Sequence, residues 1–214
     1  MSQITVIGGT GYVGSAVVAE AASRGHHVTA LSRSVPAQPV AGVRYVQGSA
    51  DDSEVLGSVI DGADAVVAAL SPRGALAGRL RPVYRCVARV AADAGAELLV
   101  VGGFNALRPA PGAPRFLEGE IPAPYEAEAR EVAAVLTDDL PQAPASLRWT
   151  FVSPPSGFGA YAPGERLGHY RLGDDVALLD GTGSGALSGA DFALAVVDLL
   201  ESPQPHPAHV GVAY

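Results

Sequence analysis

Short apolar runs alternate along the chain with longer segments in which apolar residues recur every three or four positions. Residues 4–7 form a β-rich run, and residues 12–25 have the spacing of a helix that ends at a glycine. The same alternation predicts further strands at 27–31, 43–46, 64–69, 97–101 and 148–152, and helices at 53–60, 76–94 and 126–139. Strands and helices that alternate at this spacing are typical of parallel sheets with right-handed crossovers. The predicted fold class is therefore α/β, a doubly wound Rossmann-type parallel sheet.

Loops become more frequent in the second half of the chain. Five prolines interrupt residues 108–124, directly after the fifth predicted strand, at the edge where such sheets bind ligands. This loop is either a lid or an irregular surface loop without contact to a ligand. A second loop-rich stretch, 154–185, is expected to shape a substrate pocket.

The chain then returns to regular structure. Ser188 and Asp191 have the spacing of a capping box that begins a last helix, and residues 210–214 suit a short last strand. We therefore expect a single domain over residues 1–214, in which residues 154–214 contribute pocket loops, the last helix and the last strand.

A glycine-rich turn joins the first predicted strand to the first predicted helix. Gly8 permits a tight turn, Gly11 lets the backbone approach a pyrophosphate, and Gly14 lets the helix pack closely on the strand. The free N–H groups at the helix N-terminus then face the phosphates. We predict a dinucleotide site; a turn that is rich in glycine only for packing is the alternative. The expected cofactor contacts in this turn are Gly8, Thr10, Gly11, Tyr12, Val13 and Gly14.

The end of the second strand indicates which nicotinamide cofactor is bound. An acidic residue there would accept hydrogen bonds from the ribose 2′-hydroxyl of NAD, but residues 21–50 contain no Asp or Glu. The strand ends instead at Ser32 and Arg33, which suit a 2′-phosphate, so NADPH is preferred over NADH. Arg33 as a solvated loop residue is the alternative. Asp51 either contacts adenine or, with Asp52, caps the following helix.

Charge and composition exclude several classes of function. The 14 basic and 22 acidic residues give a net charge of −8, which argues against nonspecific binding to nucleic acid or to an anionic membrane. All basic residues are arginine, so Schiff-base chemistry and a phosphate-binding loop with its lysine are excluded. The single cysteine, Cys86, is assigned no role, and none of the histidines has metal-ligand spacing, so no metal is predicted. With no signal peptide and no apolar run of membrane-spanning length, we expect a cytoplasmic monomer or homodimer that acts on a small molecule.

Several motifs together resemble the atypical short-chain dehydrogenase/reductase superfamily. The glycine turn, Leu31-Ser32-Arg33, residues 69–74, Val100-Val101-Gly102-Gly103 and residues 149–155 carry the resemblance over the whole chain. Within the superfamily, the chain is similar to NAD(P)H-binding proteins of the NADH-flavin reductase, biliverdin reductase B and NmrA-like group. This resemblance implies cofactor contacts from Leu70 and Pro72 near the nicotinamide ribose, from Gly102 and Gly103 under the nicotinamide, and from Ser153, Pro154 and Pro155 beside its carboxamide.

The chain departs from the better-known enzymes of that superfamily. Their Tyr-x-x-x-Lys pair is absent, because Tyr125 is followed four positions later by Ala129. Flat conjugated acceptors spread the incoming charge, so such an acceptor needs no strong side-chain acid. The sequence therefore favours an NADPH-dependent oxidoreductase that acts on a flavin-like or quinone-like acceptor. The candidate catalytic residues are Tyr125 and Asn105.

Other readings of the site stay open. Tyr161, His169 and Tyr170 are further candidates for orienting a substrate. A non-catalytic NADP(H)-sensing protein of the NmrA-like kind and a non-redox isomerase or epimerase-like enzyme are the alternative functions. The absent Tyr/Lys pair gives the sensor additional weight.

Overall fold

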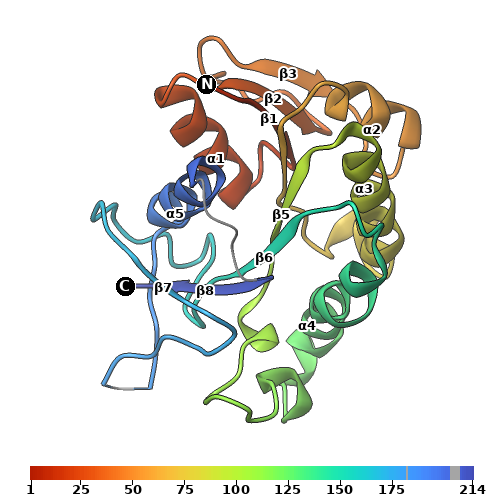
Figure 1. Ribbon diagram of the computed structural model, residues 1–214. Helices are drawn as coiled ribbons and strands as arrows, with labels where there is room; N and C mark the ends of the chain where they lie inside the picture. Colours follow the sequence, from red (N-terminus) through yellow and green to blue (C-terminus); the bar gives the residue numbers. More distant parts are fainter. Residues whose placement is uncertain (182, 203–207) are drawn as a thin grey trace.

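The computed structural model describes residues 1–181, 183–202 and 208–214, which form one eight-stranded sheet with helices on both faces (Figure 1). The strand order is β3-β2-β1-β4-β5-β6-β8-β7, and all neighbouring strands are parallel except β7 and β8. The predicted Rossmann-type α/β fold is confirmed. The strands are β1 (Gln3–Ile7), β2 (His27–Ser32), β3 (Arg44–Gln47), β4 (Ala65–Ala68), β5 (Glu97–Val101), β6 (Trp149–Ser153), β7 (Arg171–Gly173) and β8 (His209–Ala213). The helices are α1 (Tyr12–Ser23), α2 (Ser53–Ile60), α3 (Leu80–Ala94), α4 (Ala123–Ala134) and α5 (Gly189–Glu201).

The central strands are buried on both faces, which explains their continuous apolar sequences. In β4, Val66 packs in the cluster beneath α2, α3 and α4, whereas Val67 packs in the cluster beneath α1 and α5. Both side chains are fully buried. Successive strand residues point to opposite faces, so a strand covered by helices on both sides needs apolar residues at every position.

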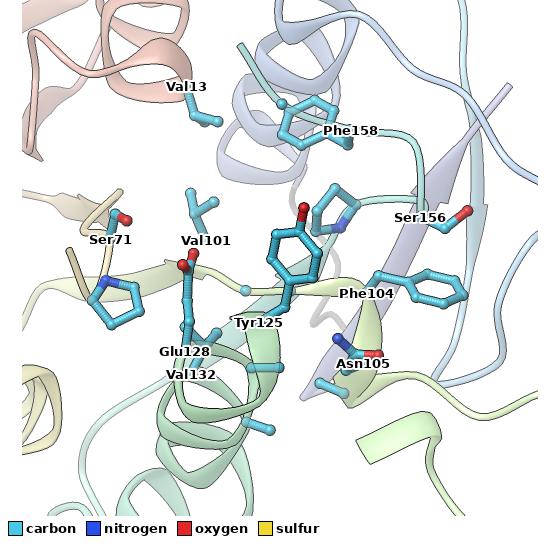
Figure 2. Close-up of a pocket in the computed structure, with 18 of the residues that line it drawn as sticks. Val13, Ser71, Val101, Phe104, Asn105, Tyr125, Glu128, Val132, Ser156 and Phe158 are labelled. Carbon is cyan, nitrogen blue, oxygen red and sulfur yellow. The ribbon is translucent and has the colours of Figure 1, made fainter. Parts of the chain in front are cut away.

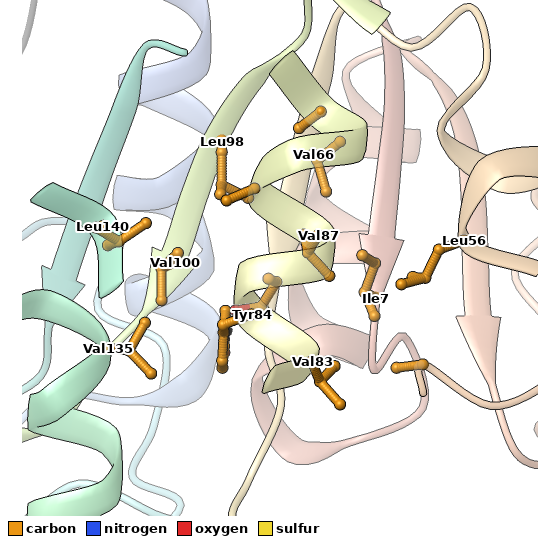
Figure 3. Close-up of a cluster of buried hydrophobic side chains, with 14 of the residues drawn as sticks. Ile7, Leu56, Val66, Val83, Tyr84, Val87, Leu98, Val100, Val135 and Leu140 are labelled. Carbon is orange, nitrogen blue, oxygen red and sulfur yellow. Dashed lines mark hydrogen bonds between the residues drawn. The ribbon is translucent and has the colours of Figure 1, made fainter. Parts of the chain in front are cut away.

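Tyr84 is the largest polar side chain in the first of these clusters (Figure 3). Its hydroxyl donates to the Ala68 carbonyl over 3.1 Å and accepts from the Leu70 N–H over 3.4 Å. Burial raises the pKa of Tyr84 well above its usual range, so the hydroxyl keeps its proton. Helix α3 thereby holds the loop after β4 in place.

Two predicted helices have different ends in the structure. The helix expected at 76–94 begins only at Leu80, after a separate 3₁₀ turn at Gly74–Leu76 and a left-handed Gly78 with φ +69°. The carboxylate of Glu131, on α4, accepts from the N–H groups of Gly78 and Leu80 at 2.9 and 2.7 Å and so caps α3. The helix expected at 126–139 begins earlier, at Ala123, and widens into a π-helical turn at Val135–Asp139. Its first turn contains a proline. A proline is tolerated there, because the N–H that it lacks would have no partner within the helix.

The C-terminal region contains one strand that the sequence pattern did not predict. Strand β7 lies within the stretch expected to be loop, and it pairs antiparallel with β8. The capping interaction expected at Ser188 is present, because its side chain accepts from the Asp191 N–H. No helix among the described residues is long and apolar enough to cross a membrane.

Candidate functional site

At Gly8 and Gly14 the turn between β1 and α1 leaves no room for a side chain. Gly8 has φ +87°, and a Cβ built on it would lie 2.4 Å from the Ala69 carbonyl oxygen. A Cβ on Gly14 would lie 2.1 Å from the Gly8 carbonyl oxygen. Real Cβ atoms do not approach backbone oxygens so closely, so these glycines allow α1 to sit directly on the turn. A Cβ on Gly11 would meet only the Gly8 oxygen, at 3.3 Å, and Gly11 itself lines the cavity described below.

The N-terminus of α1 suits a phosphate. Its N-cap residue is Gly11, and no side chain caps the helix there. The first N–H groups of a helix have no partner within the helix, and they carry its positive dipole end. Residues Gly11, Tyr12 and Val13 line the cavity, so these groups border open space. The chain therefore fits the pyrophosphate of a dinucleotide at this position.

Arg33 follows β2 directly, and its charge is not compensated by an ion pair with the described residues. Its guanidinium has no ion pair or hydrogen bond to the described part of the protein. The Nη1 atom lies 4.0 Å from where a Cβ of Gly74 would be, so the side chain reaches toward the loop after β4. Ser32, in contrast, already donates its hydroxyl proton to the Ser34 carbonyl at 2.7 Å. Ser32 would have to turn away from Ser34 to donate to a phosphate.

A cavity of about 860 Å³ opens at the carboxyl ends of β1, β4, β5 and β6 (Figure 2). We call its two parts the glycine-turn end, formed by Gly11, Tyr12 and Val13, and the aromatic end, formed by Phe104, Tyr125 and Tyr161. Figure 2 shows Val13 and Phe104 on different sides of the space, with Tyr125 between them. Parallel sheets bind ligands at this edge.

Most of the residues expected from the sequence meet at this cavity. The expected residues that line it are Gly11, Tyr12, Val13, Leu70, Pro72, Gly102, Gly103, Asn105, Tyr125, Pro154 and Pro155. Those that do not line it are Gly8, Thr10, Gly14, Ser32, Arg33 and Ser153. Gly8 and Gly14 act through backbone packing in the turn. The proline-rich loop also takes part, because Glu120, Ile121 and Pro122 line the cavity.

Ser153 lies behind the cavity. Its side chain is fully buried, and the hydroxyl donates to the Gly103 carbonyl over 3.1 Å. The same oxygen lies 2.9 Å from Nε2 of His209, and Nδ1 of His209 lies 3.2 Å from Nη1 of Arg115. Because a guanidinium can only donate, Nδ1 of His209 accepts from Arg115. The Ser153 hydroxyl gives its own proton to Gly103 and accepts from Nε2, so the network assigns the proton of a neutral His209 to Nε2. Ser153 therefore holds the backbone of the cavity floor at Gly103 and does not line the cavity.

Close packing against a core side chain explains why residue 102 is a glycine. A Cβ on it would lie 2.0 Å from Cε1 of Phe151, whose side chain is fully buried in the core. At Gly103 an added Cβ would meet only Cγ1 of Val132, at 3.6 Å. The cavity floor therefore rests directly on an aromatic ring, and its backbone carries no side chain there.

The rim of the cavity holds residues that the sequence did not identify. Nε of Arg73 donates to the Glu128 carboxylate over 2.8 Å, and this pair joins the loop after β4 to α4. Tyr125 and Tyr161, which the sequence did identify as candidates, lie on the same rim and are 60% and 77% exposed, so their rings are available to a ligand. Phe158 packs on Phe192 at 4.9 Å between ring centroids. A lone phenylalanine in a glycine-rich loop gives no periodic signal that could identify it.

Four further residues considered in the sequence lie away from the cavity. The ring of His169 packs against Tyr214, and the hydroxyl of Tyr170 donates to Asp198 over 2.6 Å. The Asp52 side chain caps α2, whereas Asp51 pairs with Arg79 over 3.1 Å. Among the described residues, no three His, Cys, Asp or Glu side chains gather as metal ligands.

Tyr12 ties the glycine turn to the C-terminal region. Its hydroxyl accepts from the Gly189 N–H over 2.9 Å and donates to the Pro163 carbonyl over 3.0 Å. Its ring centroid lies 5.5 Å from that of Phe158. The first turn of α1, the first turn of α5 and the loop after β6 are thus held together beside the cavity.

Comparisons with known proteins agree with this geometry. The model of a family described as NAD(P)H-binding matches residues 8–203. The uncharacterised protein YwnB of Bacillus subtilis is 33% identical over 208 residues, which cover 94% of this chain and 93% of that protein. A solved structure from Bacteroides thetaiotaomicron, provisionally described as an epimerase, has a TM-score of 0.86 and 30% identity, and the match covers 100% of this chain and 97% of that one. A structure from Streptococcus pneumoniae, provisionally described as an NADH-flavin reductase, has a TM-score of 0.83 and 28% identity, with 100% and 99% covered.

Proposed function

Because this chain belongs to the NAD(P)H-binding family, we propose that it is an NADPH-dependent oxidoreductase that transfers a hydride to a small conjugated acceptor of the flavin or quinone type. One observation carries the proposal: a single cavity joins the glycine-turn end to the aromatic end. Phosphates bind at the first of these, and flat rings pack well against the second. A cofactor and a flat acceptor can therefore share this space.

Such a reaction requires few catalytic groups from the protein. When bound, the cofactor supplies the hydride, and the protein holds the acceptor and keeps water out. The backbone at Gly102 and Gly103 forms a floor without side chains, and Pro154 and Pro155 cover its edge. A conjugated acceptor distributes the negative charge that it receives, so solvent can supply the proton.

Tyr125 and Asn105 are the proposed catalytic residues. Both line the cavity, and within the described part of the protein the Asn105 amide makes no hydrogen bond. We assign Asn105 to orienting a carbonyl or ring nitrogen of the acceptor, and Tyr125 to packing against the acceptor or donating a proton. A Tyr125→Phe variant separates these two roles of Tyr125, because it keeps the ring and removes the hydroxyl.

The preference for NADPH rests on the uncommitted charge of Arg33. We expect Arg33→Ala to weaken NADPH binding by about 1.5–3 kcal/mol, the range for hydrogen bonds to charged groups, and to leave NADH binding nearly unchanged. Fluorescence titration of both cofactors measures the two changes. Arg148→Ala is the matched control, because Arg148 is 77% exposed and precedes β6 at the opposite edge of the sheet. Equal losses for NADPH and NADH would remove Arg33 from the 2′-phosphate site.

The reaction itself is tested by the decay of NADPH absorbance with purified protein and a panel of flavins, quinones and small ketones. Turnover with flat acceptors is the expected result. Tight NADPH binding without turnover would instead identify a non-catalytic NADP(H)-sensing protein. The similarity to the Bacteroides protein provisionally described as an epimerase favours a non-redox enzyme as the second candidate. Conversion of a substrate with no net change in NADPH would establish that candidate. A cytoplasmic location and a monomeric or dimeric state complete the proposal.

A further inference from the structure

The aromatic end of the cavity carries an excess of negative charge. Three ionisable side chains other than tyrosine line the cavity, namely Arg73, Glu120 and Glu128. Arg73 is paired with Glu128 at 2.8 Å. Glu120 has no ion-pair partner among the described residues. Within the described part of the chain, Arg73 is the only arginine that lines the cavity. Its pairing with Glu128 neutralises it, and the Glu120 carboxylate remains uncompensated.

Arginines behind the lining are also committed to acidic partners. Arg108 pairs with Asp175 at 2.7 Å, and Arg130 pairs with Glu126 at 2.9 Å. Arg115 donates to the Ala106 carbonyl and lies 3.5 Å from Asp175. Each of these guanidinium groups therefore lies in an existing ion pair, with Arg108 and Arg115 sharing the carboxylate of Asp175.

One source of positive potential near the aromatic end is the N-terminus of α4, which follows Pro122. Its first turn contains Pro124, which has no N–H to offer, and Glu126, whose charge is paired with Arg130 at 2.9 Å. Glu120 lies two residues before the N-cap and has no such partner among the described residues. An anion at this helix end would therefore meet the uncompensated carboxylate of Glu120.

From this distribution we propose that the acceptor is a flat, conjugated molecule that carries no phosphate or carboxylate group, and that Glu120 excludes anionic forms of the same ring system. The inference rests on the proposed function and names its substrate class. The N-terminus of α1 accommodates phosphate groups at the glycine-turn end, and Arg33 extends toward the neighbouring loop after β4. A phosphate placed at the aromatic end would lose water and gain no cation.

The reaction balances with no further component. The hydride carries two electrons and one proton from NADPH to the acceptor, and the C–H bond broken on the nicotinamide becomes an N–H, C–H or O–H bond of the reduced ring. One more proton comes from solvent. NADPH is oxidised to NADP⁺, and the acceptor is reduced by two electrons.

Riboflavin and FMN provide a matched pair of probes, because they share one redox ring and differ by one phosphate. We expect kcat/KM for riboflavin to exceed that for FMN by about tenfold or more at low salt, and the ratio to fall as salt screens the carboxylate. Glu120→Gln is expected to reduce the ratio by improving FMN alone. Glu126→Gln is the control on α4; this side chain does not line the cavity, and the ratio should stay as in the wild type.

The two possible failures can be told apart. Equal turnover of riboflavin and FMN, unaltered by Glu120→Gln, would overturn the charge selection and leave the oxidoreductase intact. Turnover of neither flavin nor of a neutral quinone such as menadione would overturn the proposed function. In that case, quenching of flavin fluorescence in the presence of NADP⁺ still decides the inference. Preferred binding of riboflavin supports it, and equal binding or no binding refutes it.

Discussion

His209 makes the folded protein sensitive to acid. The side chain is 7% exposed and lies between the Ser153 hydroxyl and the Arg115 guanidinium. Burial, followed by the positive charge of Arg115, lowers the pKa of His209 from 6.5 to about 4. A second proton on the ring would sit on Nδ1, where it would face an N–H of Arg115. The folded state therefore holds the neutral imidazole.

The size of the effect follows from this shift. In the unfolded chain His209 binds a proton near pH 6.5, whereas in the folded chain it does so only near pH 4. Because the unfolded state binds the proton first as the pH falls, the free energy of unfolding decreases between these two values and then levels off. Each pKa unit is worth about 1.4 kcal/mol, so the full loss is about 3 kcal/mol, of which about 2 kcal/mol has occurred at pH 5.

The assay is denaturant unfolding of the wild type and of His209→Gln between pH 5 and pH 8. The variant loses ring packing and is less stable at pH 8, but the difference between the two proteins should shrink by about 2 kcal/mol toward pH 5. Ser153→Ala serves as the control, since it removes a hydrogen bond and keeps the titrating ring. If the stability curves of wild type and His209→Gln run parallel across this range, the pKa of His209 is not lowered and the reasoning is wrong.

Two glycine substitutions test the close contacts of the cavity floor and turn. Gly14→Ala would place a Cβ 2.1 Å from the Gly8 oxygen, so we expect the free energy of unfolding to fall by about 2 kcal/mol or more and NADPH binding to weaken at least about tenfold. Gly57→Ala is the control in α2: no atom lies within 4 Å of its Cβ position, and thermal denaturation should show a gain of about 0.5–1 kcal/mol. Gly102→Ala should cost about 1–3 kcal/mol by displacing the ring of Phe151, and a variant as stable as the wild type would show that this ring moves aside freely.

The parts of the fold that depend on local sequence were predictable. The β-rich run before Gly8 and the helix after Gly11 follow from periodicity and from glycine conformation, and the structure confirms both. The start of α3 was not predictable in the same way. Glu131 sets it, from another helix about fifty residues later in the chain, through hydrogen bonds to two N–H groups. A residue that caps a helix from outside that helix leaves no signal in the sequence around the cap.

The two ends of the candidate site also differ in how far the sequence could predict them. The glycine-turn end is one continuous segment, so its residues could be identified from their spacing. The aromatic end combines Phe104, Tyr125 and Tyr161, which only the strand order brings together. The resemblance to the superfamily implied that Ser153, Pro154 and Pro155 all contact the cofactor, but the structure separates the serine from the two prolines. The motif lies at the cavity, but its serine points to His209, a partner that is 56 residues away.

The two ends of the cavity differ in charge, and this difference also bears on how a cofactor enters. The glycine-turn end offers the dipole of α1, and Arg33, which has no ion pair with the described residues, reaches toward the loop after β4, whereas the aromatic end presents Glu120. A dinucleotide that entered in the reverse direction would bring its phosphates to this carboxylate and leave Arg33 without a partner. The same charge that rejects an anionic acceptor therefore favours one orientation of the cofactor. Replacing Glu120 should consequently weaken both the discrimination against anionic acceptors and the preference for one cofactor orientation. If the cavity selected by shape alone, replacing this charge would change neither.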